Sequence, residues 1–258
     1  MATPLLTLTL LFIFGACIGS FLNVCIYRIP VNLSIVHPGS SCPRCRRLIP
    51  FYDNIPILSY ALLMGKCRRC KAPIAIRYPL VELLGGLSAL ACGLTFGLTL
   101  HGLVVFAFVA VLIVVTFIDL DHRIIPDRIS LPGIPIFFLC TFAVSGVTWQ
   151  TSLLGILAGG GSLLAVAWVY RAMTGREGMG GGDIKLLAMI GAMVAWQGVL
   201  FTLFAASAIG TLVGLIAMLQ SGKGMRLAIP FGPFLAMGAT LYVFFGDALI
   251  TWYVGLLS

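Results

Sequence analysis

Apolar residues form long unbroken runs along most of the chain, and short polar segments separate these runs. A helix needs roughly 20 apolar residues to cross a hydrocarbon core of about 30 Å. Eight runs approach that length, so the pattern predicts an all-α polytopic membrane protein with about eight transmembrane helices. The expected spans are residues 5–27, 79–98, 103–118, 129–147, 153–170, 184–195, 199–219 and 231–257.

The first run resembles a secretory signal at first sight, but no Lys or Arg precedes it and it is longer than the usual apolar core of about 7–15 residues. We therefore expect a retained helix. Only one polar segment is long enough to fold separately. The predicted organisation is a first transmembrane helix at 1–27, a small insert at 28–78, and a seven-helix membrane domain at 79–258.

Composition supports a membrane location, since 60% of the residues are hydrophobic and 9% are charged, against roughly 25% charged in soluble domains. Nine of the sixteen Lys and Arg residues lie between Arg28 and Arg77. If that insert is cytoplasmic, eight alternating helices bring all sixteen cations to the same side, as the positive-inside rule requires. Anionic lipid then accounts for the net charge of +8, and we expect no nucleic-acid partner.

Two Cys-x-x-Cys pairs lie within the insert, Cys42 with Cys45 and Cys67 with Cys70. Their spacing is typical of a four-cysteine structural zinc site. Two disulfides or a redox pair are the alternatives, although structural disulfides are uncommon in a reducing compartment. The other four cysteines fall in apolar runs and are interpreted as packing residues.

Two aspartates stand at the edges of apolar runs, Asp119 after the third and Asp183 before the sixth. Two close carboxyl groups share a proton, so that one activates water while the other polarises a peptide carbonyl. Glycines before Asp183 would let an extended substrate backbone approach. The alternative for an Asp at a helix start is an N-cap, and we interpret Asp127, which follows Pro126, in that way.

Five segments together resemble the type IV prepilin peptidase family of bifunctional leader peptidases and N-methyltransferases. They are residues 19–24 (GSFLNV), 37–42 (HPGSSC), 77–83 (RYPLVEL), 117–119 (FID) and 180–185 (GGGDIK). The resemblance implies a multi-pass enzyme of the bacterial inner membrane with its active sites facing the cytoplasm. Its substrates would be type IV prepilins or type II secretion pseudopilins, and the sequence does not distinguish between them.

The resemblance also implies roles for individual residues. Asp119 and Asp183 match the aspartates of a GxGD-type aspartic endopeptidase, and the four insert cysteines match a zinc site. Gly65 matches a glycine linked to methylation by S-adenosyl-L-methionine. The chain has no Gly-x-Gly-x-x-Gly in a strand-to-helix setting, so the methyl-donor site rests on the resemblance. Glu82, with Asn23 and Arg77, is a further candidate for that site; the alternative role for these residues is hydrogen bonding between helices or snorkelling.

Two other classes of function fit parts of the pattern. A transporter or channel also carries acids in glycine-broken helices, but such acids would lie nearer the middle of a span. A binding module would use the insert to dock a secretion-machine partner.

Overall fold

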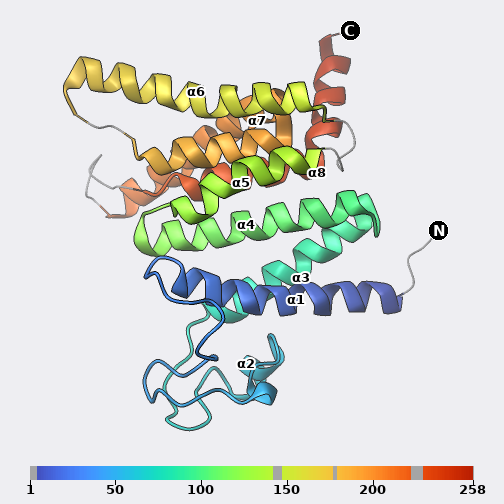
Figure 1. The fold of residues 1–258 in the computed structure, drawn as a ribbon, viewed down its shortest axis with the longest axis vertical. Helices are drawn as coiled ribbons and strands as arrows, with labels where there is room; N and C mark the ends of the chain where they lie inside the picture. The colour runs from blue at the N-terminus through green and yellow to red at the C-terminus, as the bar shows by residue number, and fades with distance from the viewer. Residues whose placement is uncertain (1–4, 142–146, 177–178, 222–228, 258) are drawn as a thin grey trace. The chain divides into compact units, whose positions relative to one another are not determined.

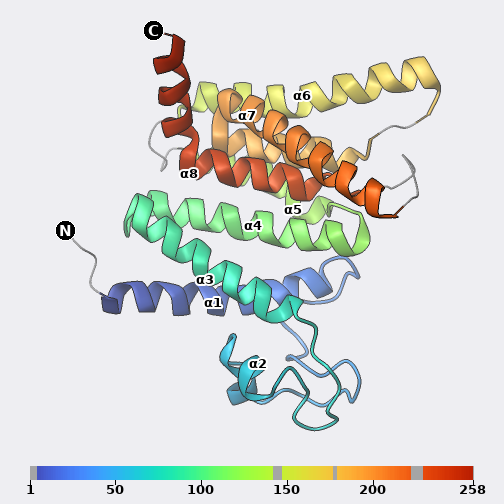
Figure 2. The same cartoon turned by 180° about the vertical axis from the view of Figure 1, so that it is seen from behind.

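The computed structural model describes residues 5–141, 147–176, 179–221 and 229–257, and within these ranges every regular element is helical. The short elements are η1 (Phe51–Asp53) and α2 (Leu58–Leu62) (Figures 1 and 2). The long helices are α1 (Leu5–Arg28), α3 (Arg77–Phe96), α4 (Leu100–His122), α5 (Asp127–Cys140), α6 (Trp149–Thr174), α7 (Gly181–Ser221) and α8 (Gly232–Leu257).

The predicted all-α membrane architecture is confirmed. Among the described residues, five helices are long and apolar enough to cross a membrane, namely α1, α3, α4, α6 and α7. The fourth expected span, residues 129–147, corresponds to the shorter helix α5, which contains Pro132 and Pro135 and ends at Cys140. Part of that span, 142–146, lies outside the described residues.

The structure also explains why the sequence predicts two spans, 184–195 and 199–219, within the residues of helix α7. Ala195 has φ of 59° and ψ of −176°, which is not a helical conformation, and it separates two helical stretches. The break falls at the last residue of the expected span 184–195, just before the span 199–219. Helix α7 is therefore two helical pieces in direct succession.

The chain divides into two compact units, Met1–Val114 and Val115–Ser258, with the boundary inside α4. In the first unit, α1 and α3 run antiparallel and pack through glycines, which allow close backbone approach. A Cβ atom on Gly19 would lie 2.7 Å from the Cα atom of Glu82. Near the polar end of this pair, the Asn23 side-chain amide donates to the carbonyl of Tyr78 over 3.0 Å.

In the second unit, α7 packs against α5, α6 and α8. Gly155 of α6 and Gly191 of α7 face each other, because a Cβ atom on either would collide with the carbonyl oxygen of the other. The Ser152 hydroxyl donates to the carbonyl of Ala192 over 2.7 Å at the same crossing. These close contacts fix the N-terminal part of α7, which carries Asp183.

Candidate functional site

The two aspartates predicted from the sequence lie in one site of the second unit. Asp119 belongs to the last turn of α4, its side chain is buried, and its Oδ2 accepts a hydrogen bond from the backbone N–H of Gly232 over 3.0 Å. Asp183 is in the first turn of α7. Its carboxyl group is close enough to that of Asp119 for the two to interact electrostatically. Both acids stand at helix ends, which is unlike the mid-span acids of an ion pathway.

Glycines bring backbone against this carboxyl pair. A Cβ atom on Gly232 would lie 2.6 Å from Oδ2 of Asp119, and one on Gly182 would lie 2.9 Å from Cβ of Ile125. Gly181, between Gly182 and Gly180, has nothing within 4 Å of its Cβ position. The glycine run thus packs tightly at Gly182, directly before Asp183, and leaves open space one residue earlier, at Gly181.

Sequence reasoning missed Gly232 as a site residue. A contact with Asp119 over 113 positions leaves no periodic signal in the sequence. The local signal was the order Phe231-Gly232-Pro233 at the start of the last apolar run, where a glycine precedes a proline at a helix start. Three charged residues near the expected cytoplasmic face, Glu177, Lys223 and Arg226, lie outside the described residues.

The interpretation of Asp127 as an N-cap is wrong. Pro126 is the N-cap residue of α5 and makes no side-chain capping bond, and Asp127 belongs to the first helical turn. The Asp127 carboxylate instead accepts hydrogen bonds from Nζ of Lys185 at 2.7 and 2.8 Å. Since Lys185 is two residues after Asp183, this ion pair ties the start of α5 to the start of α7.

The four insert cysteines form a second candidate site. All four Sγ atoms lie within 4.8 Å of one another, and those of Cys42 and Cys70 are 3.7 Å apart. A tetrahedral ion with Zn–S bonds of about 2.3 Å would place its sulfur ligands about 3.8 Å apart. The cluster can hold a metal ion. The eight cysteines are free, and Cys17, Cys25, Cys92 and Cys140 lie in helices outside the cluster.

The two Cys-x-x-Cys turns have the same backbone design. The N–H of Cys42 donates to the carbonyl of Arg47, and the N–H of Cys67 donates to that of Ala72. Backbone hydrogen bonds from Cys45 and Arg44 lower the pKa of the Cys42 thiol. Those from Cys70 and Arg69 lower the pKa of Cys67 to about 6. The first cysteine of each turn therefore favours the thiolate form, which is the form that binds metals. Cys70 differs, because despite a backbone hydrogen bond from Ala72, burial and the neighbouring cluster thiols raise its pKa to about 11.

The candidates for the methyl-donor site have clear structural contacts. Gly65 has φ of +67°, and a Cβ atom on it would lie 2.9 Å from the Tyr60 hydroxyl. Oε2 of Glu82 accepts a hydrogen bond from the backbone N–H of Ile57 over 2.7 Å. The guanidinium of Arg77 lies 5.6 Å from the centre of the Tyr78 ring. These contacts organise the insert around the start of α3.

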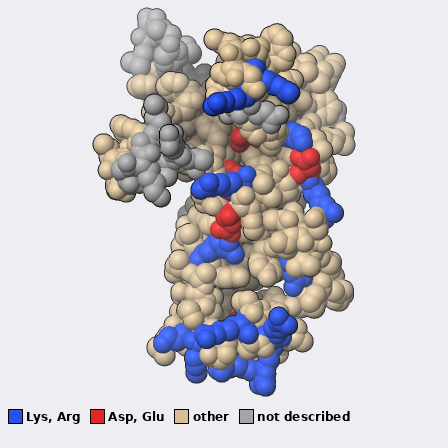
Figure 3. Space-filling model, turned by 90° about the vertical axis from the view of Figure 1, so that its left-hand side faces the viewer, with Lys and Arg blue, Asp and Glu red and all other residues tan. Residues whose placement is uncertain are grey.

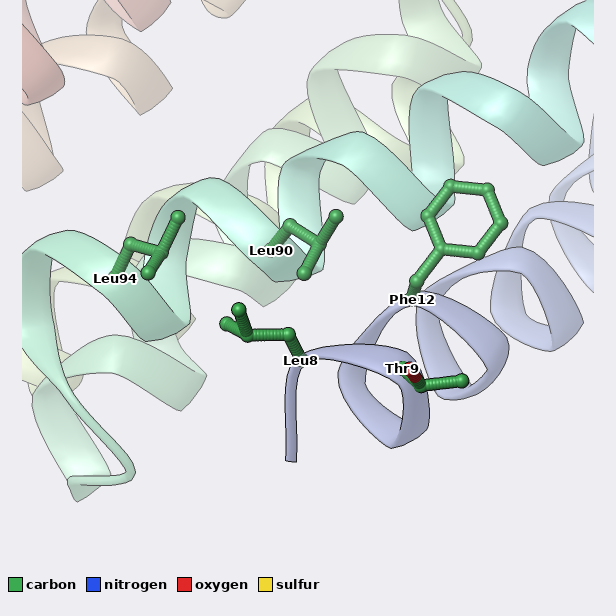
Figure 4. Close-up of a pocket in the computed structure, with 5 residues that line it drawn as sticks. All are labelled: Leu8, Thr9, Phe12, Leu90 and Leu94. Carbon is green, nitrogen blue, oxygen red and sulfur yellow. The ribbon is translucent and has the colours of Figure 1, made fainter. Parts of the chain in front are cut away.

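An apolar groove lies elsewhere in the first unit, between α1 and α3 (Figure 4). It offers a single hydroxyl, that of Thr9, and no charged group. A methyl donor with a charged sulfur and polar substituents does not fit such a lining, whereas lipid acyl chains do. The lining residues are Leu8, Thr9, Phe12, Leu90 and Leu94.

Comparison with known proteins assigns both halves of the chain. Residues 13–96 match the family model described as Bacterial Peptidase A24 N-terminal domain, and residues 106–215 match the one described as Type IV leader peptidase family. No solved structure matches the chain.

Three relatives named prepilin leader peptidase/N-methyltransferase illustrate the similarity. The chain is 36% identical to the protein of Aeromonas hydrophila over 275 residues, which cover 97% of this chain and 95% of the relative. It is 34% identical to that of Pseudomonas putida over 266 residues, covering 95% and 92%. It is 41% identical to that of Myxococcus xanthus over 213 residues, covering 83% and 64%.

Proposed function

The chain belongs to the type IV leader peptidase family, and from this premise we propose that it removes the leader of type IV prepilins or type II secretion pseudopilins and methylates the new N-terminus. Asp119 and Asp183 are the proposed catalytic pair. The observation that carries this proposal is that the two carboxyl groups lie close enough to interact electrostatically, although 64 positions separate them in the sequence.

Cleavage by this pair needs one carboxylate and one protonated carboxyl. The carboxylate takes a proton from a water molecule as its oxygen attacks the scissile carbonyl carbon, and the carboxyl donates its proton to the carbonyl oxygen. The tetrahedral intermediate then collapses and the C–N bond breaks. The leaving nitrogen receives the proton that the first carboxylate took from water, and the second carboxylate takes back a proton from a hydroxyl of the intermediate as its C=O bond forms again. The products are a leader that ends in a carboxylate and a mature protein with a free amine.

The surroundings of the pair suit an extended peptide substrate. The backbone N–H of Gly232 holds one oxygen of Asp119 in place, which leaves the other oxygen of that carboxyl for substrate or water. The open space at Gly181 lets a peptide backbone pass close to Asp183. Positioning of this kind is a large part of what an aspartic peptidase contributes to its reaction.

The insert supplies the proposed metal centre. One Zn²⁺ would be held by Cys42, Cys45, Cys67 and Cys70. Its role would be structural, because a site with four thiolate ligands leaves no position for a reactive water molecule. S-adenosyl-L-methionine is the proposed methyl donor, and it supplies an electrophilic methyl group to the amine that cleavage exposes. Gly65 and Glu82 contribute by shaping the insert, as their contacts with Tyr60 and Ile57 indicate.

The proposed location is the bacterial inner membrane, with the insert and both sites on the cytoplasmic side. The distribution of Lys and Arg supports this orientation, since an insert with nine of the sixteen cations is retained on the cytoplasmic side. A short basic leader, synthesised in the cytoplasm, would reach the aspartates from that side.

One assay tests the proposal as a whole. The purified protein in detergent is mixed with a prepilin and labelled S-adenosyl-L-methionine, and mass spectrometry follows leader loss and methyl gain separately. We expect both products, with methylation confined to the cleaved form. A protein that binds the prepilin and releases it unchanged would act as a binding module, and the proposal would be wrong.

A further inference from the structure

Between the two Cys-x-x-Cys turns lies an apolar stretch, residues 51–64, here called the interknuckle segment. We infer that this segment is a membrane anchor, which lies in the headgroup and upper acyl-chain layer beside α1 and α3 and fixes the insert to anionic lipid. The inference needs only the membrane location of the chain, so it stands apart from the proposed catalytic roles.

The interknuckle segment carries large apolar side chains that are more exposed than buried in the described structure. Leu58 and Leu62, four residues apart on α2, share one face and are 52% and 73% exposed, while Ser59 is buried. Phe51 and Met64 are 86% and 83% exposed. Such a concentration of apolar surface in a polar insert marks an interaction site.

The segment also carries no unpaired charge. Its one carboxylic acid, Asp53, forms a bidentate ion pair with Arg68 of the second turn, and the shortest distance, from Nη2 of Arg68 to Oδ1 of Asp53, is 2.6 Å. The Arg68 guanidinium lowers the pKa of the Asp53 carboxyl, so the pair stays ionised and mutually neutralised. No Lys or Arg occurs within residues 51–64. Contact with lipid therefore requires no isolated charge to leave water.

A hydrogen bond to α3 places this segment alongside the pair of helices α1 and α3 and not beyond their ends. The N–H of Ile57, directly before α2, donates to Glu82 over 2.7 Å. Glu82 is five residues into α3, and Gly19, which packs against it, is nine residues before Arg28 at the end of α1. At 1.5 Å per residue these positions are about 7 and 13 Å inside the helix ends.

The figures show the same arrangement within the first unit. In both views α2 lies beside the C-terminal half of α1 (Figures 1 and 2). Interfacial helices insert their apolar face about 5–10 Å into the boundary between headgroups and acyl chains, and the hydrogen bond to Glu82 holds Ile57 alongside the first turns of α3, where that boundary is expected. Ile57 itself has φ of 62°, a conformation that β-branched residues rarely adopt. The bond to Glu82 thus holds a strained turn against the membrane-spanning helix.

Charge on either side of the segment identifies the partner as anionic lipid. Six exposed cations besides the paired Arg68 flank it within the two turns, and Lys and Arg side chains crowd the insert at the bottom of the view (Figure 3). Apolar side chains between two basic clusters match acyl chains beneath negative headgroups. The cations are Arg44, Arg46, Arg47, Lys66, Arg69 and Lys71.

Tryptophan fluorescence in vesicles tests the inference. The four native tryptophans are replaced by Phe, and a single Trp is introduced as Leu62→Trp or Leu58→Trp in the full chain. The matched control is Val36→Trp, because Val36 is 69% exposed, similar to Leu62, and its loop lies over the end of α1. There the Arg28 guanidinium donates to the carbonyls of Ser34 and Pro38.

Each protein is reconstituted into vesicles that contain phosphatidylglycerol, with or without bromine on the acyl chains. We expect bromine to quench the probes at positions 58 and 62 several-fold more than the probe at position 36, with emission shifted to the blue. Equal quenching at positions 36 and 62 would overturn the inference. Blue-shifted emission without quenching would mean that protein, such as a second copy of the chain, covers the segment, and it would also overturn it.

A second measurement avoids substitutions altogether. The unsubstituted protein is irradiated in vesicles that contain a lipid with a photoreactive acyl chain, and the crosslinked peptides are identified by mass spectrometry. We expect adducts within residues 51–64, and fewer when phosphatidylcholine replaces phosphatidylglycerol. Adducts confined to the long helices, with none in the insert, would contradict the anchor.

Discussion

The carboxylate of Asp119 accepts a hydrogen bond over 3.0 Å from the backbone N–H of Gly232, a residue 113 positions later in the chain. The bond joins the end of α4 to the start of α8. It is close because Gly232 has no side chain, since a Cβ atom there would lie 2.6 Å from the bonded oxygen. The start of α8 thus positions one of the two proposed catalytic acids.

Gly232→Ala tests this positioning. The added methyl group must displace the Asp119 carboxylate, and losing a hydrogen bond to a charged group costs about 1.5–3 kcal/mol. We expect the cleavage rate to fall about 10- to 100-fold, since 1.36 kcal/mol corresponds to a factor of ten. Gly161→Ala in α6 is the control, because nothing lies within 4 Å of that position. Equal rates for the two variants would show that Gly232 does not position Asp119.

Gly182 and Gly181 offer a matched pair next to Asp183. Gly182→Ala puts a methyl group 2.9 Å from Cβ of Ile125, whereas Gly181→Ala points into open space. We expect Gly182→Ala to lower kcat at least ten-fold, because Ile125 and the start of α7 must shift. Gly181→Ala puts its methyl group in the space proposed for the substrate backbone, so we expect it to raise KM for a short prepilin peptide and to leave kcat within a few-fold of normal. Cleavage kinetics of both variants decide the point, with melting temperatures as the folding check. A larger loss of kcat in Gly181→Ala than in Gly182→Ala would contradict these roles.

Much of the fold follows from the sequence alone. A helix that crosses a membrane needs a long apolar run, and such runs are visible in the sequence. Each expected span therefore contains a helix or a helical piece, including the two pieces of α7 on either side of Ala195. The extent of α5 was less predictable, since Pro132 and Pro135 lie inside it and the apolar run continues past its end at Cys140.

The candidate sites were likewise predictable from the sequence only in part. The Cys-x-x-Cys spacing is local and predicts the cysteine cluster directly, as the structure confirms. Contacts between residues far apart in the sequence carry no local signal, so the sequence did not predict three of them. These are the hydrogen bond from Gly232 to Asp119, the ion pair of Lys185 with Asp127 and the hydrogen bond from Ile57 to Glu82. Asp127 was interpreted as a cap because Asp is a favoured N-cap residue and this one precedes an apolar run.

The cysteine cluster is tested by removing one ligand. We expect one zinc per chain in freshly purified protein and much less in Cys67→Ser, because a site with three thiolates binds its ion less tightly. Cys17→Ser is the control, since Cys17 is exposed and lies outside the cluster. Elemental analysis gives the zinc content. Cleavage should persist in Cys67→Ser, because the cysteines and the aspartates belong to different units of the chain. Freshly purified unsubstituted protein that cleaves a prepilin and contains no zinc would contradict the assignment.

Gly65→Ala tests the link between the insert and methylation. The φ of +67° at Gly65 costs a residue with a side chain about 1–2 kcal/mol, and the new methyl group would also press on Tyr60. We expect methylation of a cleaved substrate to fall at least ten-fold while cleavage stays near normal. Gly39→Ala is the matched control in the same insert, because its nearest neighbour, Cδ2 of Leu48, is at an ordinary 3.7 Å. Parallel loss of both activities would point to general unfolding.

The most direct test of the account is to replace the aspartates one at a time. Asp119→Asn and Asp183→Asn keep the size of each side chain and remove its ability to exchange a proton, so a pair that shares one proton loses its function in either variant. Cleavage of a prepilin and methylation of a substrate cleaved beforehand are measured on the same preparations. We predict that each variant loses cleavage and retains methylation. Normal cleavage by either variant would contradict the assignment of Asp119 and Asp183 as the catalytic pair.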